Sequence, residues 1–397
     1  MTAFSTFVTA ARRLVLAFGL FASFSGGNIA TADEQFVPRG LRACTPEDTA
    51  MGYAVICKEA LPATHIKREL DKLQRTNFTY EVQGDTLVVA VRMTAEEAFY
   101  PNGPYLCCEI QAYLDKISEG VYSASFRWAR MADAMLDLRF MNVNSRPDAR
   151  LKLNGPSSFV FVDANIDESL IARSGAELLT SIYAAGDVLG LRKLSVFRGS
   201  RCLKTVSQCA VIYMPDGEYV RMFVLNALAN KIDMSRFVVA GVHNADQNSS
   251  DARIEELLLG LNDTRYDAFM RFITRDVRQH VEHGEKPHHR YAAGLSNGGS
   301  WAYNALGSQS EYFDGAIIMS PGERKTQSEG ALAGRIVVIG AGYMETNFYK
   351  NTSIIAAGLK SRGASVNEVY VASGHGLNTW INIWNAAIKQ LNDQAKH

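Results

Sequence analysis

The clearest chemical pattern in the sequence is a serine set among glycines, Ser296 in Gly-Leu-Ser-Asn-Gly-Gly at residues 294–299. An apolar run that predicts a strand precedes it, and a run with helical spacing follows it. A serine at such a strand-to-helix turn is held on a strained backbone, and small neighbours relieve the crowding there. The helix N-terminus favours negative charge, so the backbone N–H of Asn297 is a candidate donor to an oxyanion. We therefore interpret Ser296 as a nucleophile.

A nucleophilic serine needs a neighbouring base near neutral pH, and His375 is the candidate. In folds with this kind of serine turn, the partners follow along the chain in the order serine, acid, histidine. His375 is the one histidine between Ser296 and the terminal His397, and it stands in Ser-Gly-His-Gly after the last predicted strand. Its order and place predict a general base.

The third member of the site is predicted to be a glutamate, because no aspartate occurs between Asp314 and His375. Glu345 follows the predicted strand at residues 335–339 by a short loop, which would deliver its carboxylate to the same sheet edge as His375. An exposed Glu345 without a role and a site of Ser296 and His375 alone are the alternatives. Three further glutamates in that interval are less well placed: Glu323, Glu329 and Glu368.

A second oxyanion donor is expected from the loop after an early strand, where Pro-Asp-Gly-Glu-Tyr occupies residues 215–219. The backbone N–H of Gly217 or Glu218 is the candidate, and a simple reverse turn is the alternative because Pro-Asp-Gly favours turns. Trp301, Tyr343 and Trp380 lie near the proposed site in sequence. They predict an aromatic substrate pocket, and core packing explains them equally well.

The elements that must position these residues show two different sequence patterns, one in each half of the chain. Short β-prone runs separated by turn residues predict a small antiparallel sandwich in the N-terminal half, at 86–93, 106–113, 122–128 and 135–140. Apolar runs then alternate with helical stretches, which predicts an α/β fold with a doubly wound parallel sheet. The strands are expected at 210–214, 237–242, 290–295, 315–319, 335–339 and 368–372, and the helices at 266–283, 300–306, 351–361 and 379–392.

Several segments, taken in order, resemble the esterase family that includes enterochelin esterases, esterase D and bacterial feruloyl esterases. They are residues 213–218, Arg253 and Glu256 in Arg-Ile-Glu-Glu-Leu, residues 294–299, Ser320-Pro321, residues 340–345, and Gly374-His375 with Trp380. The resemblance implies an α/β-hydrolase fold, a Ser-Glu-His or Ser-His apparatus for ester hydrolysis, and Arg253 with Glu256 as a structural pair near the site. The N-terminal half resembles the immunoglobulin-like domain of enterochelin esterases. The expected organisation is an all-β immunoglobulin-like domain at 33–155 and an esterase domain at 156–397.

The N-terminus and the cysteines predict export. Arg12 and Arg13, a short apolar run and Ala-Thr-Ala at 30–32 form the layout of a signal peptide at 1–32, with a membrane anchor as the alternative. Six cysteines without metal or redox spacing favour disulfides in a secreted or periplasmic protein. We expect Cys202 to pair with Cys209. We expect Cys107 and Cys108, which are too close to bond each other easily, to pair with Cys44 and Cys57.

The balance of charges limits the kinds of partner that the protein is expected to bind. Forty-one basic residues match forty-one acidic ones, so no net field favours nucleic acid or a membrane surface. The histidines at 280, 283, 288 and 289 lack a carboxylate pattern, so we expect no metal there. Acyl transfer to water through a serine needs no cofactor, and we expect none. The sequence therefore predicts a serine carboxylic ester hydrolase acting through an acyl-enzyme on a small-molecule ester, most like an enterochelin (siderophore) esterase or a feruloyl-type esterase. An acyltransferase with the same triad and a non-catalytic binding protein are the alternatives.

Overall fold

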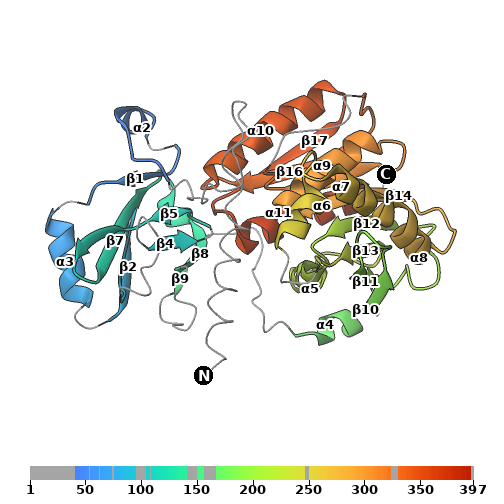
Figure 1. Cartoon of the computed structure of the whole chain (residues 1–397), viewed down its shortest axis with the longest axis horizontal. Coiled ribbons are helices and arrows are strands. Elements are labelled where there is room, and N and C mark those ends of the chain that lie inside the picture. Colours follow the sequence, from blue (N-terminus) through green and yellow to red (C-terminus); the bar gives the residue numbers. More distant parts are fainter. Residues whose placement is uncertain are drawn as a thin grey trace.

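The computed structural model describes most of the chain between residues 41 and 394 (Figure 1). The described residues are 41–52, 54–61, 63–73, 76–94, 104–107, 109–140, 150–155, 167–245, 250–322 and 330–394. The predicted signal peptide, Cys108, Glu323 and Glu329 lie outside them. Within the described ranges, the helices are all too short or too polar to cross a membrane.

An eight-stranded sheet forms the larger, C-terminal region, and six of its strands run parallel. The parallel strands confirm the predicted α/β fold, because central strands of such sheets are buried on both faces and are apolar throughout. Their spatial order is β13 (Phe237–Val242), β12 (Ala210–Pro215), β14 (His289–Leu295), β15 (Gly315–Met319), β16 (Ile336–Gly342) and β17 (Ser365–Val371). Two antiparallel strands that the sequence did not predict extend the edge, β11 (Leu191–Arg198) and β10 (Glu177–Ala184).

Helices cover both faces of this sheet. Alternate side chains of β12 point to opposite faces, and each face has its own apolar core. Val211 and Tyr213 belong to one apolar core, whereas Ile212 and Met214 belong to another. The first core includes residues of α7 (Asp263–Arg271), α8 (Arg278–Glu282), α9 (Asn297–Ser308) and α10 (Thr346–Ser361), and the second those of α5 (Val220–Ala229) and α11 (Leu377–Gln394). The remaining elements are α4 (Ser169–Arg173), α6 (Ser250–Leu257), the 3-10 helix η4 (Gly217–Tyr219) and the π-helix η5 (Phe272–Val277). The sheet is thus doubly wound.

Two antiparallel sheets form the N-terminal region and share one apolar core. One contains β1 (Cys57–Glu59), β7 (Val121–Arg127), β3 (Thr86–Arg92) and β2 (Phe78–Gln83), with β6 (Asp115–Ser118) beside β7. The other contains β5 (Ala112–Tyr113), β4 (Tyr105–Cys107), β8 (Met135–Phe140) and β9 (Arg150–Asn154). The region is not all-β, because it also carries α2 (Pro46–Ala50), α3 (Ala63–Leu73) and the 3-10 helix η2 (Met131–Asp133). An immunoglobulin-like topology stays a prediction.

The N-terminal sheets lie beside the carboxyl ends of β16 and β17 (Figure 1). The backbone N–H of Met135 donates to the carbonyl of Ala372 at 2.8 Å, and Met344 and Ala372 belong to the core that the two N-terminal sheets share. Trp128 also contacts Tyr343, with ring centroids 5.9 Å apart. Because carboxyl ends of parallel strands carry the chemistry in such sheets, the N-terminal region borders the predicted site.

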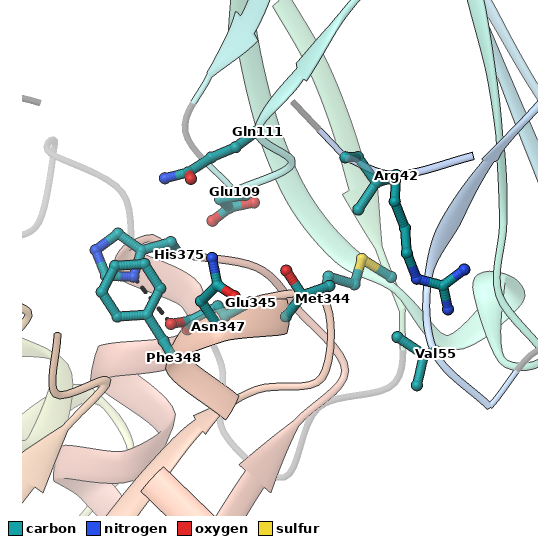
Figure 2. A pocket seen from close by; sticks show the side chains of 11 residues that line it. Arg42, Val55, Glu109, Gln111, Met344, Glu345, Asn347, Phe348 and His375 are labelled. Carbon is teal, nitrogen blue, oxygen red and sulfur yellow. Dashed lines mark hydrogen bonds and ion pairs between the residues drawn. The ribbon is translucent and has the colours of Figure 1, made fainter. Parts of the chain in front are cut away.

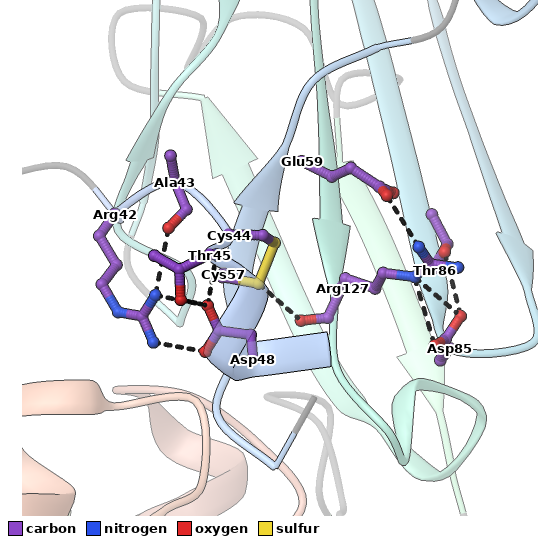
Figure 3. The surroundings of a disulfide bond; sticks show 10 residues. All are labelled: Arg42, Ala43, Cys44, Thr45, Asp48, Cys57, Glu59, Asp85, Thr86 and Arg127. Carbon is purple, nitrogen blue, oxygen red and sulfur yellow. Dashed lines mark hydrogen bonds and ion pairs between the residues drawn. A yellow bond between two sulfur atoms is a disulfide. The ribbon is translucent and has the colours of Figure 1, made fainter. Parts of the chain in front are cut away.

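Two disulfides lie within the described residues. Cys202 bonds Cys209, as predicted. Cys44 bonds Cys57, so the expected pairing of these two cysteines with Cys107 and Cys108 is wrong (Figure 3). Cys44 is brought there by an isolated bridge between Ala43 and Lys58, which sets the segment beside β1. Sequence spacing cannot reveal such a pairing, because it depends on how the chain returns after α2.

Candidate active site

Ser296 stands at a sharp turn between β14 and α9. Its backbone has φ 55° and ψ −120°, a conformation that L-residues rarely adopt and that stores strain at functional turns. A Cβ at Gly294 would lie 2.0 Å from the carbonyl oxygen of Gly298, and a Cβ at Gly298 would lie 2.9 Å from Oδ2 of Asp216. The turn therefore requires the glycines that flank Ser296, as the sequence pattern indicates.

Ser296, His375 and Glu345 form one chain of hydrogen bonds. His375 Nε2 lies 3.1 Å from Ser296 Oγ, and His375 Nδ1 lies 2.9 Å from Glu345 Oε2. The exposed fractions are 6% for Ser296, 7% for His375 and 4% for Glu345, so all three residues are buried. The arrangement has the geometry of a nucleophile, a base and an orienting acid.

Glu345 is held by donors on both of its carboxylate oxygens. Oε1 accepts from Ser320 Oγ at 2.8 Å and from the backbone N–H of Gly342 at 2.9 Å, which leaves Oε2 for His375. Trp380 Nε1 in turn donates to Ser320 Oγ at 3.1 Å. Buried carboxylates need such partners, because an unpaired buried charge is costly. These contacts fix the direction in which the carboxylate meets the imidazole.

Aromatic rings hold the imidazole of His375 from two sides. Phe348 stacks on it with ring centroids 3.9 Å apart and planes inclined by 21°, and Trp380 meets it edge-on at 5.2 Å. Sequence reasoning missed Phe348, although it follows Glu345 by three residues and therefore lies one helical turn further along α10. The same helix start thus supplies both the acid and an aromatic neighbour of the base.

The loop after β12 packs against the start of α9, beside the serine turn. Asp216 there has φ 55°, and Gly217 begins the 3-10 helix η4. A Cβ at Gly217 would lie 2.2 Å from the carbonyl oxygen of Gly241, so the loop lies close against β13. The structure brings this loop and the N–H of Asn297 to one end of the sheet. A donor role for Gly217 or Glu218 stays a prediction.

Arg253 anchors that loop through Asp216. Its guanidinium donates to both carboxylate oxygens of Asp216, at 2.6 and 2.7 Å, and Asn244 donates to the same carboxylate at 2.8 Å. The expected pair of Arg253 with Glu256 is therefore wrong. Glu256 instead accepts from Arg192 and from Arg265, although residues three apart on a helix lie on the same side.

The three predicted pocket aromatics have different surroundings. Trp301 is fully buried in the core of the sheet against Phe269 and Phe313, so its role is packing. Tyr343 lies among aromatic neighbours at the border with the N-terminal region. Trp380 is the one of the three that contacts the catalytic candidates, through His375 and Ser320.

A pocket of about 320 Å³ opens beside His375 (Figure 2). Residues 344–348 and His375 line it from the loops after β16 and β17 and the start of α10, and Leu41, Arg42, Val55, Glu109 and Gln111 line it from the N-terminal region. Figure 2 shows Glu109 and Gln111 on one side, facing His375. Sequence reasoning missed these N-terminal residues, because no motif marks them. In the described ranges, no three metal-binding side chains gather into a site.

No family model and no curated protein matches this sequence. The architecture is the mixed α/β fold of α/β-hydrolase-like esterases, which agrees with the family resemblance seen in the sequence. At the low identities involved, the similarity to solved structures establishes this fold.

Among solved structures, the chain is similar to the enterochelin esterase from Shigella flexneri, at 13% identity and a TM-score of 0.53, over 82% of this chain and 98% of that one. The enterobactin esterase from Shigella flexneri in the presence of enterobactin matches at 14% identity and a TM-score of 0.55, again over 82% and 98%. The same esterase in the presence of 2,3-dihydroxy-N-benzoyl-serine matches at 13% and 0.53, over 83% and 99%.

Proposed function

We propose that this protein is a serine carboxylic ester hydrolase that works through an acyl-enzyme. The observation that carries the proposal is the hydrogen-bonded chain from Ser296 through His375 to Glu345, at 3.1 and 2.9 Å. Its position at the carboxyl ends of β14, β16 and β17 supports the same conclusion, since chemistry in such sheets takes place there.

In the proposed mechanism, Ser296 Oγ attacks the ester carbonyl while His375 Nε2 accepts its proton. The tetrahedral intermediate collapses to an acyl-Ser296 ester, and His375 returns the proton to the departing alkoxide. Water then attacks the acyl group by the same steps in reverse, releasing the acid. Glu345 holds the Nδ1–H of the imidazole and stabilises the imidazolium that forms at each stage.

The backbone N–H of Asn297, with Gly217 or Glu218, is proposed to bind the oxyanion. Asn297 is the first residue of α9, where N–H groups point outward unpaired and the helix dipole favours negative charge. The loop that carries Gly217 is fixed by Arg253, which supports a preorganised donor.

The substrate class that we propose is that of enterochelin (siderophore) esterases, with feruloyl-type esters second. The solved enterochelin esterase matches 82% of this chain, whereas residues 156–397 make up only about 61% of it, so the similarity extends into the N-terminal region. That shared region borders the pocket beside His375. A domain border near residue 155 belongs to the same proposal.

We also propose that the protein is exported by a signal peptide at residues 1–32 and acts in the periplasm or outside the cell. Two disulfides support this, because such bonds persist in oxidising compartments.

The test compares the purified mature protein with Ser296→Ala on p-nitrophenyl acyl esters, a feruloyl ester and a catecholate siderophore lactone. We expect hydrolysis by the wild type and a loss of at least about 10³-fold in kcat in the variant. A labelled fluorophosphonate should modify the wild type and not the variant. A folded wild type that neither hydrolyses any ester nor takes up the label would overturn the proposal.

A further inference from the structure

A loop of the N-terminal region reaches the turn that carries His375. The sequence predicts one strand at residues 106–113, but the structure divides it into β4, which ends at Cys107, and β5, which begins at Ala112. Glu109 lies in the interruption and is only 4% exposed, although glutamate is rarely buried. The break therefore sends a carboxylate away from its own sheet and into the interface.

The backbone of Glu109 is in direct contact with the histidine turn. Its carbonyl oxygen accepts from the N–H of His375 at 3.3 Å. A Cβ at Gly374 would lie 1.6 Å from that oxygen, and a Cβ at Gly376 would lie 2.6 Å from Cγ of Glu109. The glycines on either side of His375 are thus the residues that let the N-terminal loop approach.

The side chain of Glu109 continues the contact on both sides. One carboxyl oxygen accepts from the backbone N–H of Asp137 in β8, and the other accepts from Asn378 Nδ2 at 3.3 Å. Asn378 lies in the first turn of α11, three residues after His375. Glu109 therefore links the N-terminal sheet to both ends of the turn that presents the base.

The titratable groups near Glu109 are Asp137, Glu345 and His375. Burial raises the pKa of Glu109 to about 8, and the charges of Asp137 and Glu345 act in the same direction. Near neutral pH the group is therefore mostly a neutral acid, and it adds no second negative charge beside the imidazole.

We propose that Glu109 is a positioning residue for His375, so that the N-terminal region completes the active site instead of only covering it. This inference rests on the proposed hydrolase function and deepens it. Without the contact, the turn from Gly374 to Gly376 has fewer constraints, and the distance from His375 Nε2 to Ser296 Oγ is less well defined. Small misplacements of a catalytic group have large effects on rate.

Two variants of Glu109 separate positioning from other roles. Glu109→Ala removes both side-chain contacts and should lower kcat by about 10- to 100-fold, with KM changed by less than about threefold. Glu109→Gln keeps an acceptor for the Asp137 N–H, and the Asn378 amide can rotate to accept from the new NH₂ group. It should therefore restore kcat to within about threefold of the wild type.

Glu69→Ala is the matched control, because Glu69 is a fully buried carboxylate of α3 in the same region, with its ion pairs to Arg68 and Lys72. It should leave kcat unchanged. Near-UV circular dichroism and the urea midpoint show whether each variant is folded. An equal loss of kcat in Glu69→Ala would assign the effect to general destabilisation and overturn the inference.

Two further outcomes decide against Glu109 as a positioning residue. A raised KM with unchanged kcat in Glu109→Ala would make Glu109 a substrate contact, and wild-type kinetics would make it a structural residue only. The wild type and Ser296→Ala, measured in parallel, test the hydrolase function separately. If no ester in the panel is hydrolysed, the rate of fluorophosphonate labelling of Ser296 replaces kcat, and an unlabelled wild type overturns both proposals.

Discussion

The imidazole of His375 lies face to face with the ring of Phe348, with centroids 3.9 Å apart. In the proposed mechanism the imidazole becomes a cation at each proton transfer, and a cation is stabilised over an aromatic face. Phe348→Leu should therefore lower kcat by about two- to tenfold. Phe348→Tyr, which keeps the ring face, should retain wild-type kcat. Steady-state kinetics on one p-nitrophenyl ester compare the two, and equal kcat in both variants would contradict the role of the ring.

The contacts of Glu345 predict a graded series. Glu345→Gln should lower kcat by about 10²- to 10⁴-fold, because the amide cannot stabilise the imidazolium and presents a donor where an acceptor is needed. Ser320→Ala removes one donor to Oε1 and should cost about tenfold or less, since the N–H of Gly342 still holds that oxygen. Full activity in Glu345→Gln would show that Ser296 and His375 work as a dyad.

The serine turn predicts a strong difference between two glycines. Gly294→Ala places a Cβ 2.0 Å from a carbonyl oxygen and should lower the free energy of unfolding by about 3 kcal/mol or more. Gly358→Ala in α10 is the matched control, because a Cβ there meets nothing within 4 Å. That substitution should stabilise the protein by about 0.5–1 kcal/mol. Urea unfolding of the two variants measures both effects, and a stable Gly294→Ala protein would argue against the described turn.

The anchor of the loop after β12 predicts a stability effect at Arg253. Removing it in Arg253→Ala leaves the buried Asp216 carboxylate with only Asn244 as its described side-chain donor, which should lower the free energy of unfolding by about 2–4 kcal/mol. Asp216→Asn combined with Arg253→Ala removes the buried charge and should recover part of that loss. Urea denaturation of the single and double variants measures the free energy of unfolding of each. No recovery in the double variant would show that the charge is not the cause.

The pKa of Glu109 predicts how stability depends on pH. The group keeps its proton to about pH 8 in the folded protein, against an ordinary value of 4.5. Between these values the folded state binds more protons than the unfolded chain, so the free energy of unfolding falls as pH rises through this window. Glu109→Gln lacks this term and should lose about 3–5 kcal/mol less than the wild type between pH 4.5 and 8.5. Parallel pH profiles in both proteins would contradict a buried neutral acid.

The sequence predicts the parts of the site that local patterns define. Ser296 is marked by its glycines, His375 by its order in the chain, and Glu345 by the short loop after a strand, and the structure brings all three together. The central strands were predictable for a similar reason, since strands buried on both faces are apolar without interruption.

Contacts that no local sequence pattern marks were not predictable. The family resemblance implied a pair of Arg253 with Glu256, yet Arg253 binds the carboxylate of Asp216 and Glu256 binds the guanidinium of Arg192. Strand β10 is an exposed edge whose Leu179 and Ile182 face solvent, so it lacks the alternation that identifies a half-buried strand. Glu109 sits in an apolar run that favours a strand, and no pattern in that run indicates that Glu109 lies against the Gly374–Gly376 turn, where the strand is broken.

The link from Glu109 to Asn378 spans 269 residues of sequence. The contact can therefore form only late in the synthesis of the chain. Glu109 and Ser296 are synthesised before the histidine that both must meet. The hydrogen-bonded set of Ser296, His375 and Glu345 therefore cannot form in the nascent polypeptide before residue 375 has been added. Under the proposed mechanism, a product truncated before residue 375 keeps Ser296 but lacks its base, so such chains should bind no fluorophosphonate label and hydrolyse no ester.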